Sequence, residues 1–258
     1  MAGLTEAAVP GHERGAALVT GGAKRIGRAI CLELAAAGFD VAVHHRDSDD
    51  EAAALVRDIE AMGRRAVALS ADLADVVATH ELIGRAVQAL GALSVLVNNA
   101  SVFGDDRLDT ITGESWSEHL DTNLRAPVLL AQVFARQAPD GAAIVNILDQ
   151  RVLKPDPRFF SYSLSKSALW FATRTMAQAL APRIRVNGVG PGPTLPSVHQ
   201  TPEAFEAEAR ATPLQRAGRP EAVAAAVRWL VDADLVTGQM IAVDGGQHLA
   251  WQTPDIVE

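Results

Sequence analysis

Hydrophobic and polar positions alternate along the chain in blocks of two lengths. Short apolar runs rich in Val, Ile, Leu and Ala are separated by longer stretches in which apolar residues recur at helical spacing. This alternation is typical of β-α-β units around a parallel sheet, since strands that are covered on both faces are apolar throughout. The short runs predict seven strands, at residues 16–20, 40–44, 65–70, 93–98, 142–147, 183–189 and 240–243. The longer stretches predict six helices, at residues 25–37, 49–62, 76–90, 113–137, 161–181 and 220–232.

The pattern predicts one α/β domain over residues 16–258, a seven-stranded parallel sheet with helices on both faces. A chain of 258 residues can build the core of such a domain. Residues 1–15 include Glu, His, Arg and Pro and predict a flexible N-terminal segment. Residues 191–212 are irregular, rich in Pro and Thr, and too long for an ordinary connection, which predicts a substrate loop. Its residues Leu195, Val198 and His199 do not define a substrate.

Composition excludes several classes of partner. The chain has 23 basic and 31 acidic residues, and its net charge of −8 argues against binding to nucleic acid or to an anionic membrane. It has no apolar run of about 18 residues, and residues 1–15 lack the apolar core of a signal peptide. The single cysteine, Cys31, cannot form an internal disulfide and lies in an apolar helical stretch. We therefore expect a cytoplasmic protein.

The first predicted strand runs directly into a glycine-rich turn, TGGAKRIG, and a helix follows at once. Glycines allow a tight turn and let the backbone approach a pyrophosphate, whose charge is favoured by free N–H groups at a helix N-terminus. The turn alone is a weak signal, since it could be purely structural. If the turn is a dinucleotide site, we expect cofactor contacts from five of its residues: Gly21, Lys24, Arg25, Ile26 and Gly27.

The second predicted strand is followed by His45 and Arg46, where enzymes that prefer NAD place an acidic residue for the ribose 2′-hydroxyl. Arg46 can pair with a 2′-phosphate, so the sequence favours NADPH over NADH, although Arg46 could also be a solvated strand-end arginine.

No metal is expected, because the seven histidines show no metal-ligand spacing.

The ends of the third and fourth strands complete the expected cofactor site. Asp72, followed by Leu73, is placed to accept a hydrogen bond from an adenine amine. Asn99 and Ala100 close the fourth strand at the same edge of the sheet. Each of these polar residues alone could instead be a capping residue.

Tyr162 is the only tyrosine, and Lys166 follows it four residues later in a helical stretch. Their side chains therefore share one face of the helix. An ammonium group beside the phenol predicts a lowered pKa for Tyr162, which would allow it to donate a proton to a carbonyl or imine near neutral pH.

Together these motifs resemble the short-chain dehydrogenase/reductase family over nearly the whole chain. The matching segments are TGGAKRIG, the Asn-Asn-Ala ending at Ala100, Asn123 in DTNLRAP, Tyr162-x-x-x-Lys166, and Pro191-Gly192 after the sixth strand. The resemblance implies a Rossmann fold, a homotetramer, and cofactor contacts from Pro191, Gly192, Tyr162 and Lys166. It also implies that Tyr162 is the acid, that Lys166 holds the nicotinamide ribose, and that Asn123 supports a proton-relay water.

Two residues depart from the common family pattern. Arg25 stands where most members have a small residue, and Asp149 stands thirteen residues before Tyr162, where most members have serine. Pteridine reductases and bacterial dihydromonapterin reductases are similar to this chain at both positions. Trypanosomatid pteridine reductases also share Ser101 and Phe103 after Asn-Asn-Ala.

This resemblance implies a reductase of pterins or dihydrofolate. A planar pterin could stack between Phe103 and the nicotinamide, while Arg25 and Ser101 bond to it. Hydride would pass to a C=N carbon, and Tyr162 coupled to Asp149 would protonate the ring nitrogen.

Other interpretations of these residues stay open. Arg25 could only clamp the cofactor phosphate, Phe103 could be loop packing, and Asp149 could be a helix cap or an ion-pair partner. The second functional hypothesis is an NADPH-dependent carbonyl reductase, and a third is a non-catalytic dinucleotide-binding module.

Overall fold

The computed structural model describes residues 14–197 and 200–251, and the predicted segment 1–15 lies almost entirely outside this range, as do Val198 and His199. All seven predicted strands form, with ends within two residues of the expected positions. They are β1 (Ala16–Val19), β2 (Asp40–His45), β3 (Ala66–Ser70), β4 (Leu93–Asn98), β5 (Ala142–Ile147), β6 (Ile184–Pro191) and β7 (Met240–Val243).

The strands form one parallel sheet in the order β3-β2-β1-β4-β5-β6-β7. The order reverses between β1 and β4, the kind of position where open α/β sheets bind ligands at the carboxyl ends of their strands. This arrangement confirms the predicted fold class.

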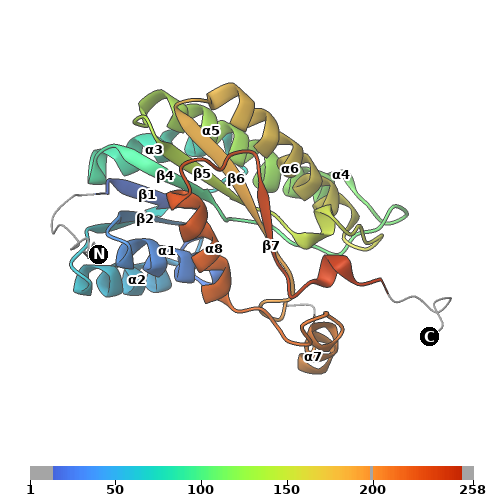
Figure 1. The fold of residues 1–258 in the computed structure, drawn as a ribbon. Coiled ribbons are helices and arrows are strands. Elements are labelled where there is room, and N and C mark those ends of the chain that lie inside the picture. The colour runs from blue at the N-terminus through green and yellow to red at the C-terminus, as the bar shows by residue number, and fades with distance from the viewer. Residues whose placement is uncertain (1–13, 198–199, 252–258) are drawn as a thin grey trace.

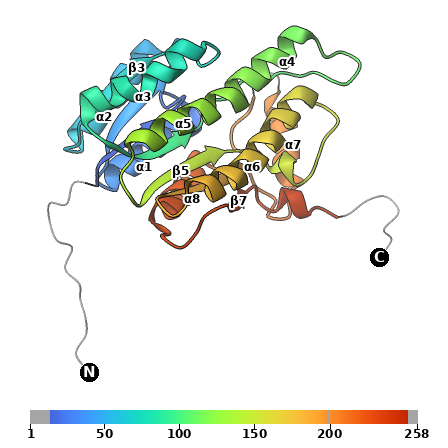
Figure 2. The same ribbon diagram turned by 90° about the horizontal axis from the view of Figure 1, so that it is seen from above.

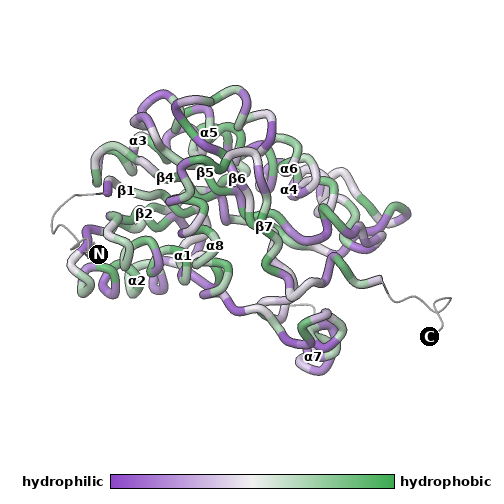
Figure 3. The backbone as a smooth tube through the Cα atoms, in the orientation of Figure 1, coloured by the Kyte–Doolittle hydropathy of each residue, from purple (hydrophilic) through white to green (hydrophobic). Residues whose placement is uncertain are grey.

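Helices cover both faces of the sheet (Figure 1). One face packs against α1 (Arg25–Ala36), α2 (Asp49–Ala61) and α8 (Pro220–Asp232) around a core that includes Ile30, Leu55 and Val227. The other packs against α3 (Val76–Leu90), α5 (Ala126–Gln137) and α6 (Phe160–Leu180) around Leu82 and Phe134. Seen from above, α5 and α6 run side by side (Figure 2). Hydrophobic residues concentrate in the strands between these layers (Figure 3).

The helix predicted at residues 113–137 is not a single regular helix. It consists of α4 (Gly113–Leu120), a π-helical turn at Asp121–Arg125, and α5. Pro127 lies in the first turn of α5, and it has no N–H to donate to the carbonyl four residues earlier, that of Asn123. The π turn accommodates this missing bond and places Asn123 in the protein interior.

The segment predicted to be irregular, residues 191–212, contains a further helix, α7 (Pro202–Arg210). Thr201 caps its N-terminus by accepting a hydrogen bond from the Ala204 N–H, and Pro202 occupies the first turn, where its missing donor costs nothing. Its residues are mostly exposed, and the helix stands apart from the sheet in Figure 1. A helix with so little apolar surface gives no clear periodic signal in the sequence.

Candidate active site

The glycine-rich turn joins β1 to α1, and its geometry requires glycine. Gly21 has a φ of +58°, and a Cβ at Gly27 would lie 2.1 Å from the Gly21 carbonyl oxygen. The N-terminus of α1 has no side-chain cap and no acidic residue in its first turn. Its free N–H groups and positive dipole end therefore suit a phosphate anion.

His44 holds this turn in place from the end of β2. Its Nδ1 atom accepts a hydrogen bond from the Gly21 N–H at 3.0 Å, and its Nε2 atom lies 3.1 Å from the Ala71 carbonyl oxygen. These bonds require a neutral ring with the proton on Nε2. Burial lowers the pKa of His44 to about 4, which keeps the ring neutral. The sequence predicts a cofactor contact from His45 instead, although the alternation of side chains along a strand identifies His44 as the residue on the opposite face.

A cavity of about 420 Å³ lies along the ends of β1 to β4. It is lined by eleven of the predicted cofactor and substrate residues, namely Gly21, Lys24, Arg25, Ile26, Gly27, Arg46, Asp72, Leu73, Asn99, Ala100 and Ser101. His45 is not among its lining residues; its ring accepts a hydrogen bond from the Ser48 N–H. Pro191 and Gly192 lie outside the cavity at the end of β6, where the Gly192 N–H donates to the Val243 carbonyl.

Arg46 lies in this cavity beside the carboxylate of the next residue, Asp47. Its Nε donates to Asp47 Oδ2 at 2.7 Å, and both side chains are largely exposed. The hydrogen bond to Asp47 raises the pKa of Arg46. A 2′-phosphate would compete with an exposed carboxylate, which holds the guanidinium only weakly.

Asn99 and Asp72 both bond to nearby backbone. Asn99 Nδ2 donates to the carbonyl oxygens of Thr20 and Gly21, at 2.8 and 2.9 Å, and so fixes the strand end beneath the glycine turn. Asp72 Oδ1 accepts from the Ala74 N–H at 2.9 Å. Both residues line the cavity while holding its walls together.

Three of the four predicted catalytic residues, Asp149, Tyr162 and Lys166, lie at the carboxyl end of β5. The Tyr162 hydroxyl donates to Asp149 Oδ2 at 2.8 Å, and Arg151 Nη1 lies 3.3 Å from the same oxygen. Asp149 also caps the short 3₁₀ helix Gln150–Val152 by accepting from the Arg151 N–H. Arg151 was missed, because its role depends on this local turn.

The expected lowering of the Tyr162 pKa is wrong for this structure. Burial and the adjacent Asp149 carboxylate raise the pKa of Tyr162 well above its usual value. Lys166 does not counter this, since its Nζ donates to the Ile147 carbonyl at 2.9 Å and lies 5.8 Å from the centre of the phenol ring. Tyr162 therefore holds its proton through neutral pH, as an acid must before it donates.

Lys166 is almost fully buried, and burial lowers its pKa from 10.5 to about 8, against the opposing charge of Asp149. A buried ammonium group with a single carbonyl partner has donors to spare for a ligand. This is compatible with a bond to a ribose hydroxyl.

Asn123, in the π turn, connects the loop after β4 to α6. Its Oδ1 accepts from the Val102 N–H and the Ser101 hydroxyl, and its Nδ2 donates to the Val102 carbonyl and to Ser165 Oγ. It therefore fixes the loop that carries Ser101.

Phe103 contacts Tyr162 directly. Its ring meets the Tyr162 ring edge-on at a centroid distance of 4.7 Å and stacks on Phe159 at 4.5 Å. The Arg151 guanidinium lies over both phenylalanine rings. An aromatic and cationic wall thus stands beside the acid.

Arg25 connects the glycine turn to the segment after β6. Its Nη2 donates to the carbonyl oxygens of Leu195 and Pro196 at 3.3 and 3.0 Å. The backbone at Arg25 has a φ of +53°, a left-handed conformation that favours glycine. The predicted substrate loop and the cofactor turn are therefore in contact through this side chain.

Among residues 14–197 and 200–251, no cluster of three or more metal-ligating side chains is found. Within the same residues, no helix is both long enough and apolar enough to cross a membrane.

Residues 21–248 match the family described as enoyl-(acyl carrier protein) reductase. The chain is 36% identical to an uncharacterized oxidoreductase of Methylorubrum extorquens, over 89% of this chain and 96% of that protein. It is 33% identical to the 3-oxoacyl-(acyl-carrier-protein) reductase FabG of Staphylococcus epidermidis, over 90% and 98% of the two chains. The structure resembles FolM alternative dihydrofolate reductase 1 from Brucella canis, solved in complex with NADP. The TM-score is 0.91 at 48% identity, over 95% of this chain and 98% of that chain.

Proposed function

Because the chain belongs to the short-chain dehydrogenase/reductase family, we propose that it is an NADPH-dependent reductase of pterin or dihydrofolate-type substrates. The observation that carries this proposal is the hydrogen bond of 2.8 Å between the Tyr162 hydroxyl and the Asp149 carboxylate. A carboxyl group can store and pass on a proton, whereas a hydroxyl at the same position could only donate and accept hydrogen bonds. The similarity to the Brucella canis FolM reductase supports the same substrate class.

The residues of the cavity fit NADPH. The pyrophosphate suits the uncapped N-terminus of α1 above Gly21, and the 2′-phosphate suits Arg46, which exchanges its exposed bond to Asp47 for a doubly charged partner. Asp72 and Leu73, which line the cavity, would hold the adenine end. When bound, the cofactor supplies the hydride that reduces the substrate.

The other end of the cofactor is held by residues nearer the acid. Lys166, whose Nζ uses one donor on the Ile147 carbonyl, would donate to the nicotinamide ribose, and Pro191 and Gly192 at the end of β6 would hold the nicotinamide. The solved Brucella canis relative holds NADP, which supports this assignment.

Tyr162 and Asp149 supply the proton. Hydride addition to the carbon of a C=N bond leaves an electron pair on the nitrogen, which takes the Tyr162 proton. A phenolate left beside a carboxylate is unfavourable, as the raised pKa of Tyr162 indicates. The proton that Tyr162 gives up must therefore be replaced from solvent, and Asp149, whose Oδ2 accepts the Tyr162 hydroxyl bond, would take up that proton and pass it to Tyr162.

A planar substrate fits beside the aromatic wall. Phe103 places an aromatic ring next to Tyr162, and Ser101 and Arg25 provide donors at the edge of the cavity. Asn123 holds the Ser101 loop and supports the relay of protons through the site. Together these groups favour a flat ring with donor and acceptor edges.

A keto group is the second candidate substrate. The FabG relative of Staphylococcus epidermidis is named as a 3-oxoacyl reductase, and Tyr162 could protonate a carbonyl oxygen in the same way as a ring nitrogen. In that reaction Asp149 would be incidental.

The enzyme also assembles as a homotetramer in this proposal. Large apolar side chains stand exposed on α6 and α8, with Phe171 at 66% and Trp229 at 53% exposure. Exposed apolar surface of this kind favours self-association. Light scattering of the purified protein tests this, and a monomeric mass would contradict it.

The deciding experiment follows the oxidation of NADPH by the purified protein with dihydropterins, dihydrofolate and simple ketones. We expect pterins or dihydrofolate to be reduced with the higher kcat/KM. Brisk reduction of ketones with no reduction of either pterins or dihydrofolate would establish the carbonyl reductase instead.

A further inference from the structure

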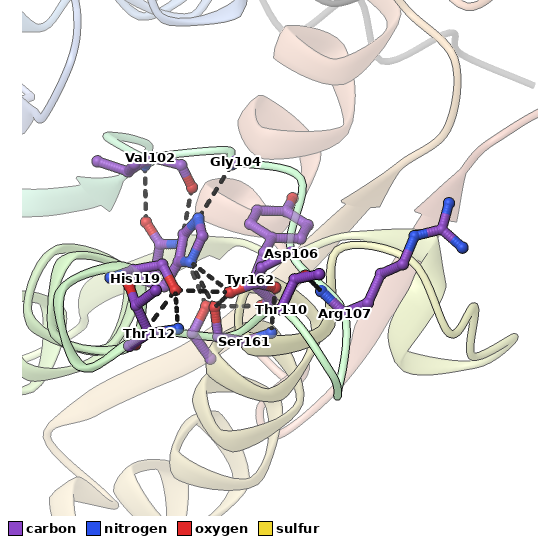
Figure 4. Close-up of polar contacts among 12 residues, drawn as sticks. Val102, Gly104, Asp106, Arg107, Thr110, Thr112, His119, Ser161 and Tyr162 are labelled. Atoms are coloured by element: carbon purple, nitrogen blue, oxygen red, sulfur yellow. Dashed lines mark hydrogen bonds and ion pairs between the residues drawn. The ribbon is translucent and has the colours of Figure 1, made fainter.

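A buried polar network lies directly behind the aromatic wall and outside the catalytic residues described above. It joins Asp106 in the loop after β4, His119 in α4 and Ser161 in the first turn of α6, and all three side chains are at most 5% exposed (Figure 4). Burying three polar groups is costly unless they are fully hydrogen-bonded. The network therefore needs an explanation.

Each bond of the network has a defined direction. The Gly104 N–H donates to His119 Nε2 at 3.0 Å, so this nitrogen carries no proton. His119 Nδ1 must then carry the proton and donate to Ser161 Oγ at 2.6 Å, while the Ser161 hydroxyl donates to Asp106 Oδ2. The chain of bonds runs from a loop backbone, through a neutral histidine, to a carboxylate.

Asp106 is at the same time the cap of α6. Its Oδ1 accepts from the Ser161 N–H at 2.9 Å and its carbonyl accepts from the Phe160 N–H, while Phe159 at the N-cap position provides no side-chain cap. Burial alone would raise the pKa of Asp106, but the hydrogen bonds from Ser161 keep it below its usual value. The network thus ties the loop to the helix end that carries Tyr162.

Ser161, His119 and Asp106 are not arranged as a hydrolytic triad. Ser161 is completely buried and its hydroxyl proton is already given to Asp106, while Asp106 lies 4.0 Å from His119 Nδ1 rather than bonded to it. His119 has no free nitrogen to take a proton from the serine, since Gly104 occupies Nε2. A positioning role is the one that this geometry serves.

The two ends of the network are adjacent in sequence to the two residues of the aromatic contact. Gly104 follows Phe103, and Ser161 precedes Tyr162. The imidazole packs so closely on the loop that a Cβ at Gly104 would lie 3.3 Å from it, and the His119 and Tyr162 ring centres are 6.1 Å apart. A change at His119 is therefore transmitted to Phe103 through a single peptide unit.

We propose that His119 is a positioning residue, which with Ser161 and Asp106 sets the Phe103 ring against Tyr162 and so defines the wall for a planar substrate. This inference rests on the proposed function only for the identity of that substrate. The physical claim is that the Gly104 N–H bond to His119 fixes the place of Phe103.

The test is a double-mutant cycle between His119 and Phe103, with the KM for a dihydropterin as its readout. His119→Phe keeps an aromatic ring but loses both hydrogen bonds, so it should raise this KM about 3- to 10-fold with a smaller change in kcat. His119→Gln can still donate and accept, and it should restore much of the loss. In the Phe103→Ala background, His119→Phe should have little further effect, because the ring that it positions is already gone.

Two controls separate positioning from general damage. The NADPH dissociation constant should stay within about 2-fold in each variant, since the network does not line the cofactor cavity. Hydrogen exchange should be faster in the loop 101–112 of His119→Phe and unchanged in β1 and α1. Additive effects of His119→Phe and Phe103→Ala on KM would overturn the positioning role, as would unchanged exchange in the loop. If the parent enzyme reduces no pterin, the proposed function fails, and the exchange measurement still tests the positioning claim.

Discussion

The cofactor half and the substrate half of the active site are held together by different kinds of bond. At the ends of β1 to β4, polar side chains such as His44 and Asn99 bond mainly to backbone atoms of the same sheet edge. Around Tyr162, by contrast, side chains bond to one another. Examples are the hydrogen bond between Tyr162 and Asp149 and the one between His119 and Ser161. A substitution in the first half removes bonds to backbone groups, whereas a substitution in the second half leaves a side-chain partner unpaired. We therefore expect catalysis and cofactor binding to be separable by mutation.

The largest effect should come from Tyr162→Phe, which removes the proton donor and leaves the ring. Turnover should fall by about 10²- to 10⁴-fold, the usual contribution of a general acid. The NADPH dissociation constant should stay almost unchanged, as measured by titration of protein fluorescence. Near-normal turnover would reduce Tyr162 to a packing residue.

Asp149→Ala should lower kcat for dihydropterins by roughly 10²-fold, because Tyr162 loses the carboxylate that relays protons to it. The matched variant Asp149→Asn keeps an acceptor for the Tyr162 hydroxyl but carries no exchangeable acid proton, and it should be equally slow. Steady-state kinetics of the two variants distinguishes proton relay by Asp149 from mere orientation of the Tyr162 hydroxyl. A fast Asp149→Asn enzyme would mean that the carboxyl group only orients Tyr162.

Arg46→Asp tests the cofactor half alone. It removes a charge-assisted bond and adds repulsion toward the 2′-phosphate, so the KM for NADPH should rise by more than about 10-fold, or about 1.4 kcal/mol. The KM for NADH should change little in the same assay. Equal use of both cofactors by the parent enzyme would contradict the assignment of Arg46.

The pH profile should report Lys166. Since burial lowers its pKa from 10.5 to about 8, the ammonium group loses its proton as the pH rises through about 8. If the charge is needed, kcat/KM should fall about tenfold per pH unit above that value. The cost of burying Lys166 shrinks over the same range, because the unfolded lysine still holds its proton between pH 8 and 10.5 while the folded one has lost it, so the unfolding free energy rises with pH. A flat profile to pH 10 would show that the charge is dispensable.

The smallest effect should come from Phe103→Ala, which removes an aromatic face. Dihydropterin binding should weaken by about 0.5–1.5 kcal/mol beyond the loss of buried area, while a small aliphatic ketone should be little affected. Comparison of KM values for the two substrates measures this. Equal losses for both substrates would assign Phe103 to packing against Phe159 and Tyr162.

The sequence predicts the cofactor half better than the substrate half, and the physical reason lies in sequence distance. Gly21, Arg46, Asp72 and Asn99 each follow a strand of one parallel sheet, so strand prediction alone brings them to one edge. Asp149 and Tyr162 are predicted to act together only because their separation of thirteen residues matches the family pattern. His119 and Asp106 meet Ser161 across 42 and 55 positions through an irregular loop, which no periodic pattern indicates.

Two further features depend on local structure that the sequence pattern does not indicate: the π turn at Asn123 and the direction of the Tyr162 pKa shift. The π turn at Asn123 follows from Pro127, a residue whose position at the start of α5 is visible only once the helix is known to be interrupted. The direction of the Tyr162 pKa shift depends on burial and on Asp149, and spacing to Lys166 alone predicted the opposite sign.

Tyr162 is the single tyrosine of the chain, and this gives the enzyme an internal spectroscopic reporter. Isotope-labelled tyrosine incorporated into the protein yields one phenol resonance per subunit, and that signal comes from the reacting hydroxyl itself. Its chemical shift follows the bond to Asp149 as cofactor and substrate are added, with no assignment needed and no background to subtract. The protonation and hydrogen bonding of the Tyr162 hydroxyl can thus be followed through the reaction in one peak.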